Sequence, residues 1–246
     1  FHVTSQSLPQ AIEGMRALNI AGINLTIPHK EAVLPLLDEI DPRAALIGAV
    51  NTVVNQRGRL HGYNTDGLGF LRSAEQELGF HPQESRVLLL GAGGACRAAA
   101  VALADAEVSC VCIANRSLER AERLVADLQG YFPAVTFSAL AFGEGAFLAS
   151  LKTADLLVNT TAVGLAGESL DFFPLEDIKP SALIYDMVYS RAETPLMKAA
   201  HSHGLRAVDG LGMLASQGEE AFYLWTGMRP TPGMMKRCLM EYRTNG

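Results

Sequence analysis

Short runs of apolar residues alternate with amphipathic segments through the middle of the chain. The clearest run is Val87-Leu88-Leu89-Leu90, which would place apolar side chains on both faces of a strand. Strands that are apolar throughout are typical of a parallel sheet covered by helices on both sides. Strands are predicted over 86–90, 108–114, 135–137, 156–158 and 183–186, and helices over 93–105, 117–129, 144–151 and 194–203. The alternation predicts a doubly wound α/β domain.

The first 80 residues have a different pattern, which indicates a separate domain. The pattern predicts helices over 8–19 and 29–40, a strand over 22–27, and a hairpin that pairs 49–55 with 59–63. Ser7 followed by Gln10 fits a capping box, which marks the start of the first helix.

The C-terminal part carries two further amphipathic segments, 211–226 and 232–243. Their apolar faces are larger than the central series of strands and helices needs, so we expect them to return to the first domain. The sequence therefore predicts a smaller α/β domain made of residues 1–66 and 211–246, and a larger domain made of residues 67–210.

Composition excludes several classes of protein. The 246 residues are 49% hydrophobic and carry a formal net charge of −6, which argues against disorder, and no block of Lys or Arg offers a footprint for nucleic acid. The longest stretch without a charged residue, 128–143, contains Gln129 and Pro133, so no membrane span is expected.

The spacing of the cysteines and the first residues of the sequence indicate the cellular compartment of the protein. The four cysteines have no Cys-x-x-Cys spacing, and each is expected to be a buried thiol. No secretory signal is recognisable at Phe1. A cytoplasmic protein is therefore expected, and the sequence leaves the oligomeric state open, a homodimer included.

A glycine-rich turn follows the first central strand directly. Gly91-Ala92-Gly93-Gly94-Ala95-Cys96 opens an Ala-rich helix, the position at which Rossmann-like domains bind a pyrophosphate. Gly91 would permit the tight turn, and Gly93 would let backbone N–H groups approach the anion. Cys96 stands where the fingerprint has its third glycine, so the motif alone is moderately specific. The alternative is a turn whose glycines serve helix packing.

The end of the second central strand indicates which dinucleotide would bind. Domains that bind NAD place a carboxylate there for the ribose 2′-hydroxyl. This chain has Asn115-Arg116-Ser117 instead, with Arg120 one turn later. Two guanidinium groups favour a 2′-phosphate, so the predicted cofactor is NADP. The alternative is a solvated helix start in which Arg120 pairs with Glu119 or Asp127.

Polar residues interrupt otherwise apolar segments of the small domain. Asn24 and Thr26 alternate with apolar residues and would share one face of a strand. Asn51 lies in an apolar strand, where its amide needs hydrogen-bond partners. Asp66 follows the hairpin at a position where capping of the next helix is an equally good interpretation.

Six stretches of the sequence resemble the shikimate dehydrogenase family. They occur in the same order as in the family and together cover almost the whole chain. The most specific strings are Asn-Leu-Thr-Ile-Pro-His-Lys, Gly-Ala-Val-Asn-Thr and Tyr-Asn-Thr-Asp-Gly, and the glycine turn, "ANRSLERA", "YDMVYSRAETPLM" and "DGLGMLASQGEEAFYLWTG" match as well. The resemblance implies an enzyme that reduces 3-dehydroshikimate to shikimate with NADPH in aromatic amino acid biosynthesis.

The resemblance also implies roles for individual residues. Lys30 would be the catalytic lysine and Asp66 its carboxylate partner. Asn24 would lie beside the substrate, Tyr189 would close over its ring, and its oxygens would be held by Thr26, Asn51, Asp66 and Gln217. The implied cofactor residues are Gly91, Ala92, Gly93, Gly94, Ala95, Asn115, Arg116, Ser117 and Arg120, with Met187 and Gly210 near the nicotinamide. The loop 159–164 resembles the family's loop after the fourth central strand. No metal site is expected, and His29 is expected to be structural.

The chain departs from the family at its start. Family members begin with a further βα unit whose Ser-x-Ser-Pro motif binds the substrate carboxylate, and we expect this chain to lack that unit and to expose a sheet edge. Ser5-Gln6-Ser7-Leu8-Pro9 has the wrong spacing to Lys30 to replace the motif. Two alternatives stay open: a quinate/shikimate dehydrogenase that prefers NAD, and a catalytically silent nucleotide-binding regulator of the same fold.

Overall fold

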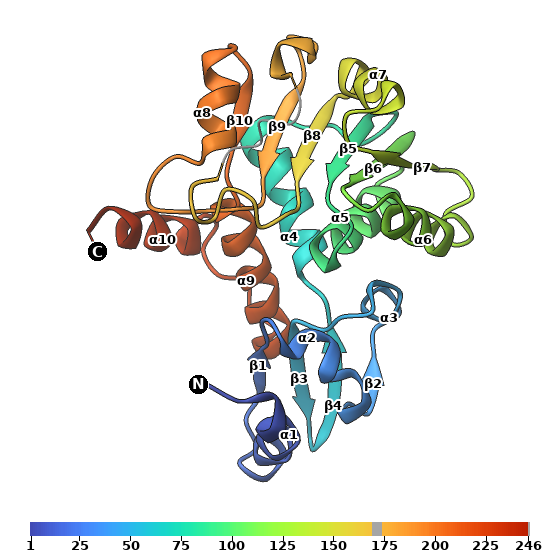
Figure 1. Ribbon diagram of the computed structural model, residues 1–246. Coiled ribbons are helices and arrows are strands. Elements are labelled where there is room, and N and C mark those ends of the chain that lie inside the picture. Colours follow the sequence, from blue (N-terminus) through green and yellow to red (C-terminus); the bar gives the residue numbers. More distant parts are fainter. Residues whose placement is uncertain (169–173, 246) are drawn as a thin grey trace.

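Two α/β domains joined by a pair of helices make up the computed structural model, which describes residues 1–168 and 174–245 (Figure 1). The two helices, α4 (Asp66–Ser73) and α9 (Leu211–Thr226), lie side by side between the domains. Gly69 permits this approach, because a Cβ there would lie 2.8 Å from the backbone nitrogen of Gln217. A five-residue π-helical segment, η3 (Ala74–Leu78), extends α4 into the large domain.

The large domain contains a six-stranded parallel sheet in the order β10-β9-β8-β5-β6-β7. This is the doubly wound order of dinucleotide-binding domains, with its switch point between β5 and β8. The strands are β5 (Arg86–Leu90), β6 (Cys110–Asn115), β7 (Thr136–Ala141), β8 (Leu156–Asn159), β9 (Leu183–Asp186) and β10 (Arg206–Val208). The connections contain α5 (Gly94–Asp105), α6 (Leu118–Gln129), α7 (Gly145–Thr153), the 3₁₀ turn η4 (Leu175–Asp177) and α8 (Pro195–Ser202).

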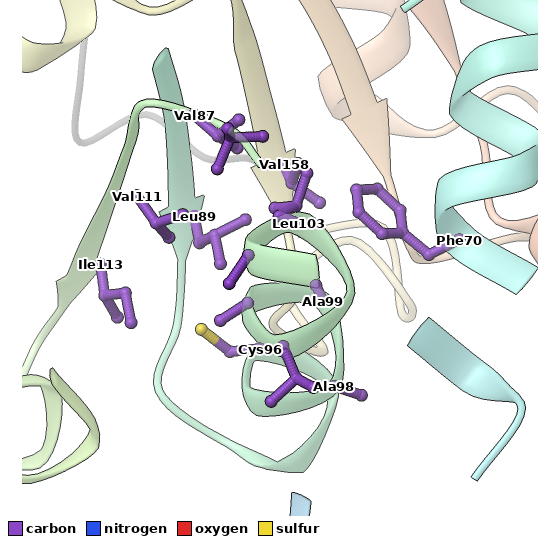
Figure 2. Packing of buried hydrophobic residues seen from close by; sticks show 14 of the residues in the cluster. Phe70, Val87, Leu89, Cys96, Ala98, Ala99, Leu103, Val111, Ile113 and Val158 are labelled. Atoms are coloured by element: carbon purple, nitrogen blue, oxygen red, sulfur yellow. The ribbon is translucent and has the colours of Figure 1, made fainter. Parts of the chain in front are cut away.

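Alternate residues of the strands enter different cores, as a sheet covered on both faces requires. Val87 and Leu89 of β5 face α5 and α6, and Figure 2 shows them beside Cys96 and Leu103 of α5. Leu88 and Leu90 face the opposite core, against α7 and α8, which contribute residues such as Phe147 and Leu196. The doubly wound α/β architecture predicted from the apolar runs is confirmed, and the short strand β10 is an addition to it.

The small domain has a four-stranded sheet in the order β1-β3-β4-β2, in which only β2 and β4 are parallel. Its strands are β1 (Gly22–Asn24), β2 (Glu39–Ile40), β3 (Thr52–Gln56) and β4 (Arg59–Tyr63). The helical segments are η1 (Ser5–Ser7), α1 (Leu8–Ala17), α2 (His29–Ala32), η2 (Leu34–Leu36) and α3 (Pro42–Ile47). One face of the sheet buries Val53 and Leu60 against Leu8, Ile12 and Met15 of α1.

Three predictions about the small domain are wrong. The strand expected over 22–27 ends at Asn24, so Thr26 lies beyond β1. The helix expected over 29–40 ends at Ala32, because Pro35 has no N–H to donate and the chain continues as η2. Ser7 does occupy the N-cap of α1, but its side chain makes no capping bond and its hydroxyl accepts a hydrogen bond from Thr4 Oγ1 instead. The predicted capping box is therefore not formed.

The C-terminal helices divide their contacts between the domains. Trp225 of α9 donates an indole hydrogen bond to the Val53 carbonyl (3.0 Å), so the end of α9 reaches β3 of the small domain. Helix α10 (Met234–Asn245) packs on α9, and its ion pairs from Lys236 and Arg243 go to Glu77 and Asp209 of segment 67–210. The assignment of residues 211–246 to the small domain stays a prediction.

All four cysteines are free thiols. Cys96, Cys110 and Cys112 are buried as expected, whereas Cys238 on α10 is exposed, which corrects the prediction for that residue. Within residues 1–168 and 174–245, no helix combines the length and apolar character that crossing a bilayer needs.

Candidate active site

A cleft of about 420 Å³ opens where the two domains meet. It gathers residues from β1 and α2 of the small domain, from the glycine turn, from the segment after β9 and from α9. The lining consists of Asn24, Leu25, Thr26, Lys30, Asn51, Asp66, Ala95, Met187, Tyr189, Gly210, Met213, Leu214 and Gln217. Every residue predicted to be catalytic or to bind substrate therefore lies at one cleft, and their individual roles stay predictions.

An ion pair between Lys30 and Asp66 lies at this cleft. Lys30 Nζ is 2.7 Å from Asp66 Oδ2, and the side chains are 27% and 15% exposed, so the pair is largely shielded from water but reachable. Lys30 belongs to the short helix α2, and its backbone carbonyl accepts the N–H of Val50. An ammonium has three donors, and the ion pair uses one of them.

The position of Asp66 rules out the capping interpretation for its side chain. Thr65 occupies the N-cap of α4, and Asp66 is the first helical residue. Its two carboxylate oxygens accept hydrogen bonds from Lys30 and from Asn51 Nδ2 (2.8 Å). The backbone N–H of Asp66 donates to Asn64 Oδ1 (3.0 Å), which fixes the turn that presents the carboxylate.

Asn51 is a buried hub beneath the ion pair, with 2% of its surface exposed. Its Oδ1 accepts the N–H of Thr65 (2.9 Å) and the hydroxyl of Thr52 (2.9 Å). Its Nδ2 lies within reach of Asp66, Thr65 Oγ1 (3.0 Å) and Gln217 Oε1 (3.3 Å). Asn51 Nδ2 has two N–H bonds for these three acceptors. The contact with Gln217 is the longest, so it is the one that a ligand can replace most easily. The prediction that this amide needs partners is confirmed.

Three other polar side chains line the cleft, and they differ in their hydrogen bonds and exposure. Asn24 donates to the Asn51 carbonyl and to Thr52 Oγ1, so it supports the hub from β1. The Thr26 hydroxyl makes no hydrogen bond to the described residues and is exposed. Tyr189 is 45% exposed, so its ring stands at the edge of the cleft and does not cover it.

The glycine turn has room on its outer side. Gly91 has φ +107°, and a Cβ there would lie 2.8 Å from Thr160 Oγ1, so both conformation and packing require glycine. At Gly93 and Gly94, by contrast, an added Cβ would have no heavy atom within 4 Å. Packing therefore does not explain these two glycines, and open space at the N-terminus of α5 fits an anion.

The arginines after β6 are exposed at the start of α6. Glu119 pairs with Arg123 and Asp127 pairs with Arg97, so neither carboxylate pairs with Arg120. Within the described residues, neither Arg116 nor Arg120 forms an ion pair. Asn115 Nδ2 donates to the Ser117 carbonyl (2.9 Å) and shapes the turn. Two cations that pair with no carboxylate of the described chain, at a helix N-terminus that disfavours cations, fit an anionic ligand.

Buried polar residues fix the segments after β8 and β9. Asp186 is fully buried and accepts hydrogen bonds from Asn159 Nδ2 (2.8 Å), Val188 N (3.1 Å) and Thr194 Oγ1 (2.7 Å). Burial raises the pKa of this carboxyl. Gly210 lies against the Met187 carbonyl, 2.2 Å from the position of a Cβ, so backbone contact accounts for glycine at this position.

Sequence reasoning missed Asp186, Met213 and Leu214. Asp186 ends an apolar strand run, which was a signal for a buried carboxylate at the carboxyl edge of the sheet. Met213 stands four residues before Gln217 on α9, a spacing that puts both on one helix face. Leu214 gave no comparable signal, because its place at the cleft depends on how α9 packs against the small domain.

The fold and the cleft define a two-domain dehydrogenase-like protein, in which a doubly wound domain offers a dinucleotide site and the small domain supplies an ammonium–carboxylate pair. Three family models match the chain: the shikimate dehydrogenase substrate binding domain at residues 1–53, shikimate / quinate 5-dehydrogenase at 72–164, and the shikimate 5'-dehydrogenase C-terminal domain at 210–239. The chain belongs to the shikimate dehydrogenase family.

Individual relatives agree with this assignment. A protein of Geobacter metallireducens named shikimate dehydrogenase (NADP(+)) is 48% identical over 240 residues, which are 98% of this chain and 84% of the relative. The crystal structure of Listeria monocytogenes shikimate 5-dehydrogenase in complex with shikimate and NAD superimposes with a TM-score of 0.90 at 31% identity, covering 97% of this chain and 84% of that one. The 5-ketofructose reductase of a Gluconobacter strain is also similar, with a TM-score of 0.87 at 34% identity, covering 98% and 86%.

Proposed function

We propose that the protein is an NADP-dependent shikimate dehydrogenase, which reversibly reduces 3-dehydroshikimate to shikimate in aromatic amino acid biosynthesis. The single observation that carries the proposal is the Lys30–Asp66 pair at a cleft whose other wall is formed by Ala95, Met187 and Gly210. Family membership supports the proposal, as does the Geobacter relative, whose name specifies NADP(+).

The chemistry needs a proton at the oxygen of the reacting carbon. NADPH, when bound, supplies the hydride to the ketone carbon. Lys30 then donates a proton to the oxygen as it becomes an alkoxide, and in the reverse direction it accepts the proton of the hydroxyl. Its positive charge stabilises negative charge as it develops, and Asp66 orients the ammonium at 2.7 Å. Lys30 and Asp66 are therefore the proposed catalytic residues.

The remaining polar groups of the small domain suit a polyhydroxylated substrate. In the proposal, Asn51, Asp66, Thr26 and Gln217 hold hydroxyl and carboxylate oxygens, and Asn24 orients the Asn51 hub. Thr26 and Gln217 have capacity to spare, since the Thr26 hydroxyl is unused by the described residues and the Gln217 contact to Asn51 is the longest of its set. Tyr189 would close over the ring.

The residues around the glycine turn fit a dinucleotide with a 2′-phosphate. The backbone of residues 91–95 would hold the pyrophosphate at the N-terminus of α5. Arg116 and Arg120 would bind the 2′-phosphate, with Asn115 and Ser117 beside the ribose. Met187 and Gly210 would lie near the nicotinamide. The open space at Gly93 and Gly94 and the lack of ion pairs at both arginines within the described chain support this assignment.

An absorbance assay at the reduced-cofactor band tests the proposal. Shikimate with NADP⁺ should give the highest kcat/KM, above shikimate with NAD⁺ and above quinate with either cofactor. Quinate with NAD⁺ as the best pair would support the alternative quinate/shikimate dehydrogenase. No oxidation of shikimate or quinate with either cofactor, in a protein that still binds NADP⁺, would support the silent regulator instead.

The domain boundaries and the location of the protein are part of the proposal. The substrate domain would comprise residues 1–66 and 211–246, and the NADP domain residues 67–210. The proposed partners are the small molecules shikimate and 3-dehydroshikimate, with neither nucleic acid nor a membrane among them, and a homodimer stays a prediction. A cytoplasmic location stays a prediction.

A further inference from the structure

The segment 187–194, which follows β9, carries two residues to the cleft. Met187 and Tyr189 line it, whereas Arg191 and Ala192 are exposed. Both ends of the segment are held by one carboxylate, because Asp186 accepts the N–H of Val188 and the hydroxyl of Thr194. We refer to residues 187–194 as the cleft loop.

A side chain from the far end of the chain holds the middle of the cleft loop. Arg243, in the last turn of α10, donates from Nε to the Arg191 carbonyl (3.1 Å) and from Nη2 to the Ala192 carbonyl (3.3 Å). Figure 1 shows α10 beside α9 and directed away from the small domain. The C-terminal helix thus reaches a loop that lies about fifty positions earlier in the sequence.

A buried carboxylate fixes the orientation of this guanidinium. Arg243 Nη1 is 2.7 Å from Asp209 Oδ2, and the side chains are 25% and 9% exposed. Asp209 Oδ1 in turn accepts the N–H of Leu211, at the start of α9. Asp209 directly precedes Gly210, another cleft residue. The guanidinium of Arg243 therefore links the segment after β9 to the segment after β10. Both segments contribute residues to this wall of the cleft.

We infer that Arg243 is a positioning residue, which clamps the cleft loop from α10 and thereby sets where Met187 and Tyr189 stand at the cleft. The planar guanidinium reaches two carbonyls and one carboxylate at the same time, which an ammonium cannot do with the same geometry. Without the clamp, the cleft loop keeps its two ends on Asp186 and gains freedom between them. The hydrogen bonds that form the clamp are independent of any function of the protein. The effect of the clamp on catalysis rests on the proposed function.

Limited digestion with trypsin tests the clamp without using activity. The bond between Arg191 and Ala192 is a trypsin site in the exposed middle of the loop. Arg243 binds the Arg191 carbonyl, which belongs to this bond, and the Ala192 carbonyl, which follows it. Arg243→Ala should speed cleavage at this bond at least about tenfold, the factor for losing one hydrogen bond of ordinary strength. Mass spectrometry identifies the bond, and cleavage elsewhere in the chain gives an internal reference.

Three further variants separate the clamp from a loss of folding. Arg243→Ala combined with Asp209→Asn removes the clamp without leaving a buried carboxylate unpaired, and it should be cleaved as fast as the single variant. Arg243→Lys can keep the ion pair but not the paired carbonyl contacts, so an intermediate rate is expected. Arg237→Ala, an exposed arginine on the same helix, should behave as wild type. Cleavage of the double variant at the wild-type rate would overturn the inference.

Steady-state kinetics with shikimate and NADP⁺ then measure the effect on the cleft. In the double variant, KM for shikimate should rise about 3- to 30-fold, with a smaller change in kcat, since the loop positions Tyr189 and donates no proton. Arg243→Lys should recover part of the loss. An unchanged KM together with fast cleavage would refute the positioning of Tyr189. A wild-type protein without activity would refute the proposed function, and the digestion rates would still decide whether the clamp exists.

Discussion

Replacement of Lys30 by methionine tests the ammonium at the cleft. The substitution keeps an unbranched apolar side chain and removes the positive charge that lies 2.7 Å from Asp66. Loss of a positioned proton donor lowers turnover by about 10²- to 10⁴-fold. That range corresponds to about 2.7–5.4 kcal/mol in the activation free energy. We expect kcat for shikimate oxidation to fall within this range.

The structure also predicts what should not change in that variant. Substrate oxygens are held in the proposal by Asn51, Thr26 and Gln217, so KM for shikimate should change less than about 3-fold. Asp66 keeps the hydrogen bond from Asn51, and the pair is partly exposed, so the free energy of unfolding should fall by only about 1 kcal/mol. Urea unfolding at pH 7 measures this loss directly.

A matched control uses Lys198, an exposed lysine of α8 that lies outside the cleft lining. Lys198→Met should leave both kcat and KM at wild-type values. A folded Lys30→Met protein that retains kcat within about 3-fold of wild type would refute the reasoning, because no other ammonium lies at the cleft among the described residues.

Three further predictions follow from the nucleotide domain. Arg120→Ala should raise KM for NADP⁺ about 5- to 50-fold and leave KM for NAD⁺ unchanged in the same assay, because its proposed partner is the 2′-phosphate; equal losses with both cofactors would count against that role. Gly210→Ala should lower the free energy of unfolding by at least about 1–3 kcal/mol, since its Cβ would meet the Met187 carbonyl at 2.2 Å; a wild-type melting temperature would contradict this. Burial raises the pKa of Asp186 above its unfolded value, so this carboxyl stabilises the fold less as pH rises from about 3.8 through the folded pKa. Asp186→Asn should therefore compare better with wild type in melting experiments at pH 7 than at pH 3.5, and a pH-independent difference would exclude the titration.

The sequence predicts the large domain better than the small one, for a physical reason. Strands β5, β6, β8 and β9 are buried on both faces, so each appears as an apolar run, and helix α8 begins close to the predicted residue 194, where the Thr194 hydroxyl accepts the Met197 N–H. In the small domain, strands β1 and β2 contain three and two residues, too few for a period to be visible. Their pairing depends on partners elsewhere in the chain.

The sequence predicted which residues belong to the candidate site, but it did not predict how these residues contact one another. The resemblance to the family singled out Lys30 and Asp66. Asn51 stood out by itself as an amide in an apolar strand, which needs hydrogen-bond partners. Nothing local indicates that Asn51 supports Asp66, or that Arg243 reaches the loop beside Tyr189. These contacts join positions 15 and 52 residues apart, and the second exists only once the C-terminal helices have folded back onto the large domain.

The ties between the domains bear on how the cleft can close. On the side of α5, Arg97 donates to the Leu46 carbonyl (2.8 Å) and Arg43 pairs with Asp105. Gly67 of α4 packs against the Ala98 carbonyl, where a Cβ would come within 2.5 Å. These contacts are local to α3, α4 and α5, whereas Tyr189 across the cleft is 45% exposed. In the proposed enzyme, a closing motion would therefore pivot near α3 and move the wall that carries Tyr189, so the position of the cleft loop would set how tightly the substrate is covered.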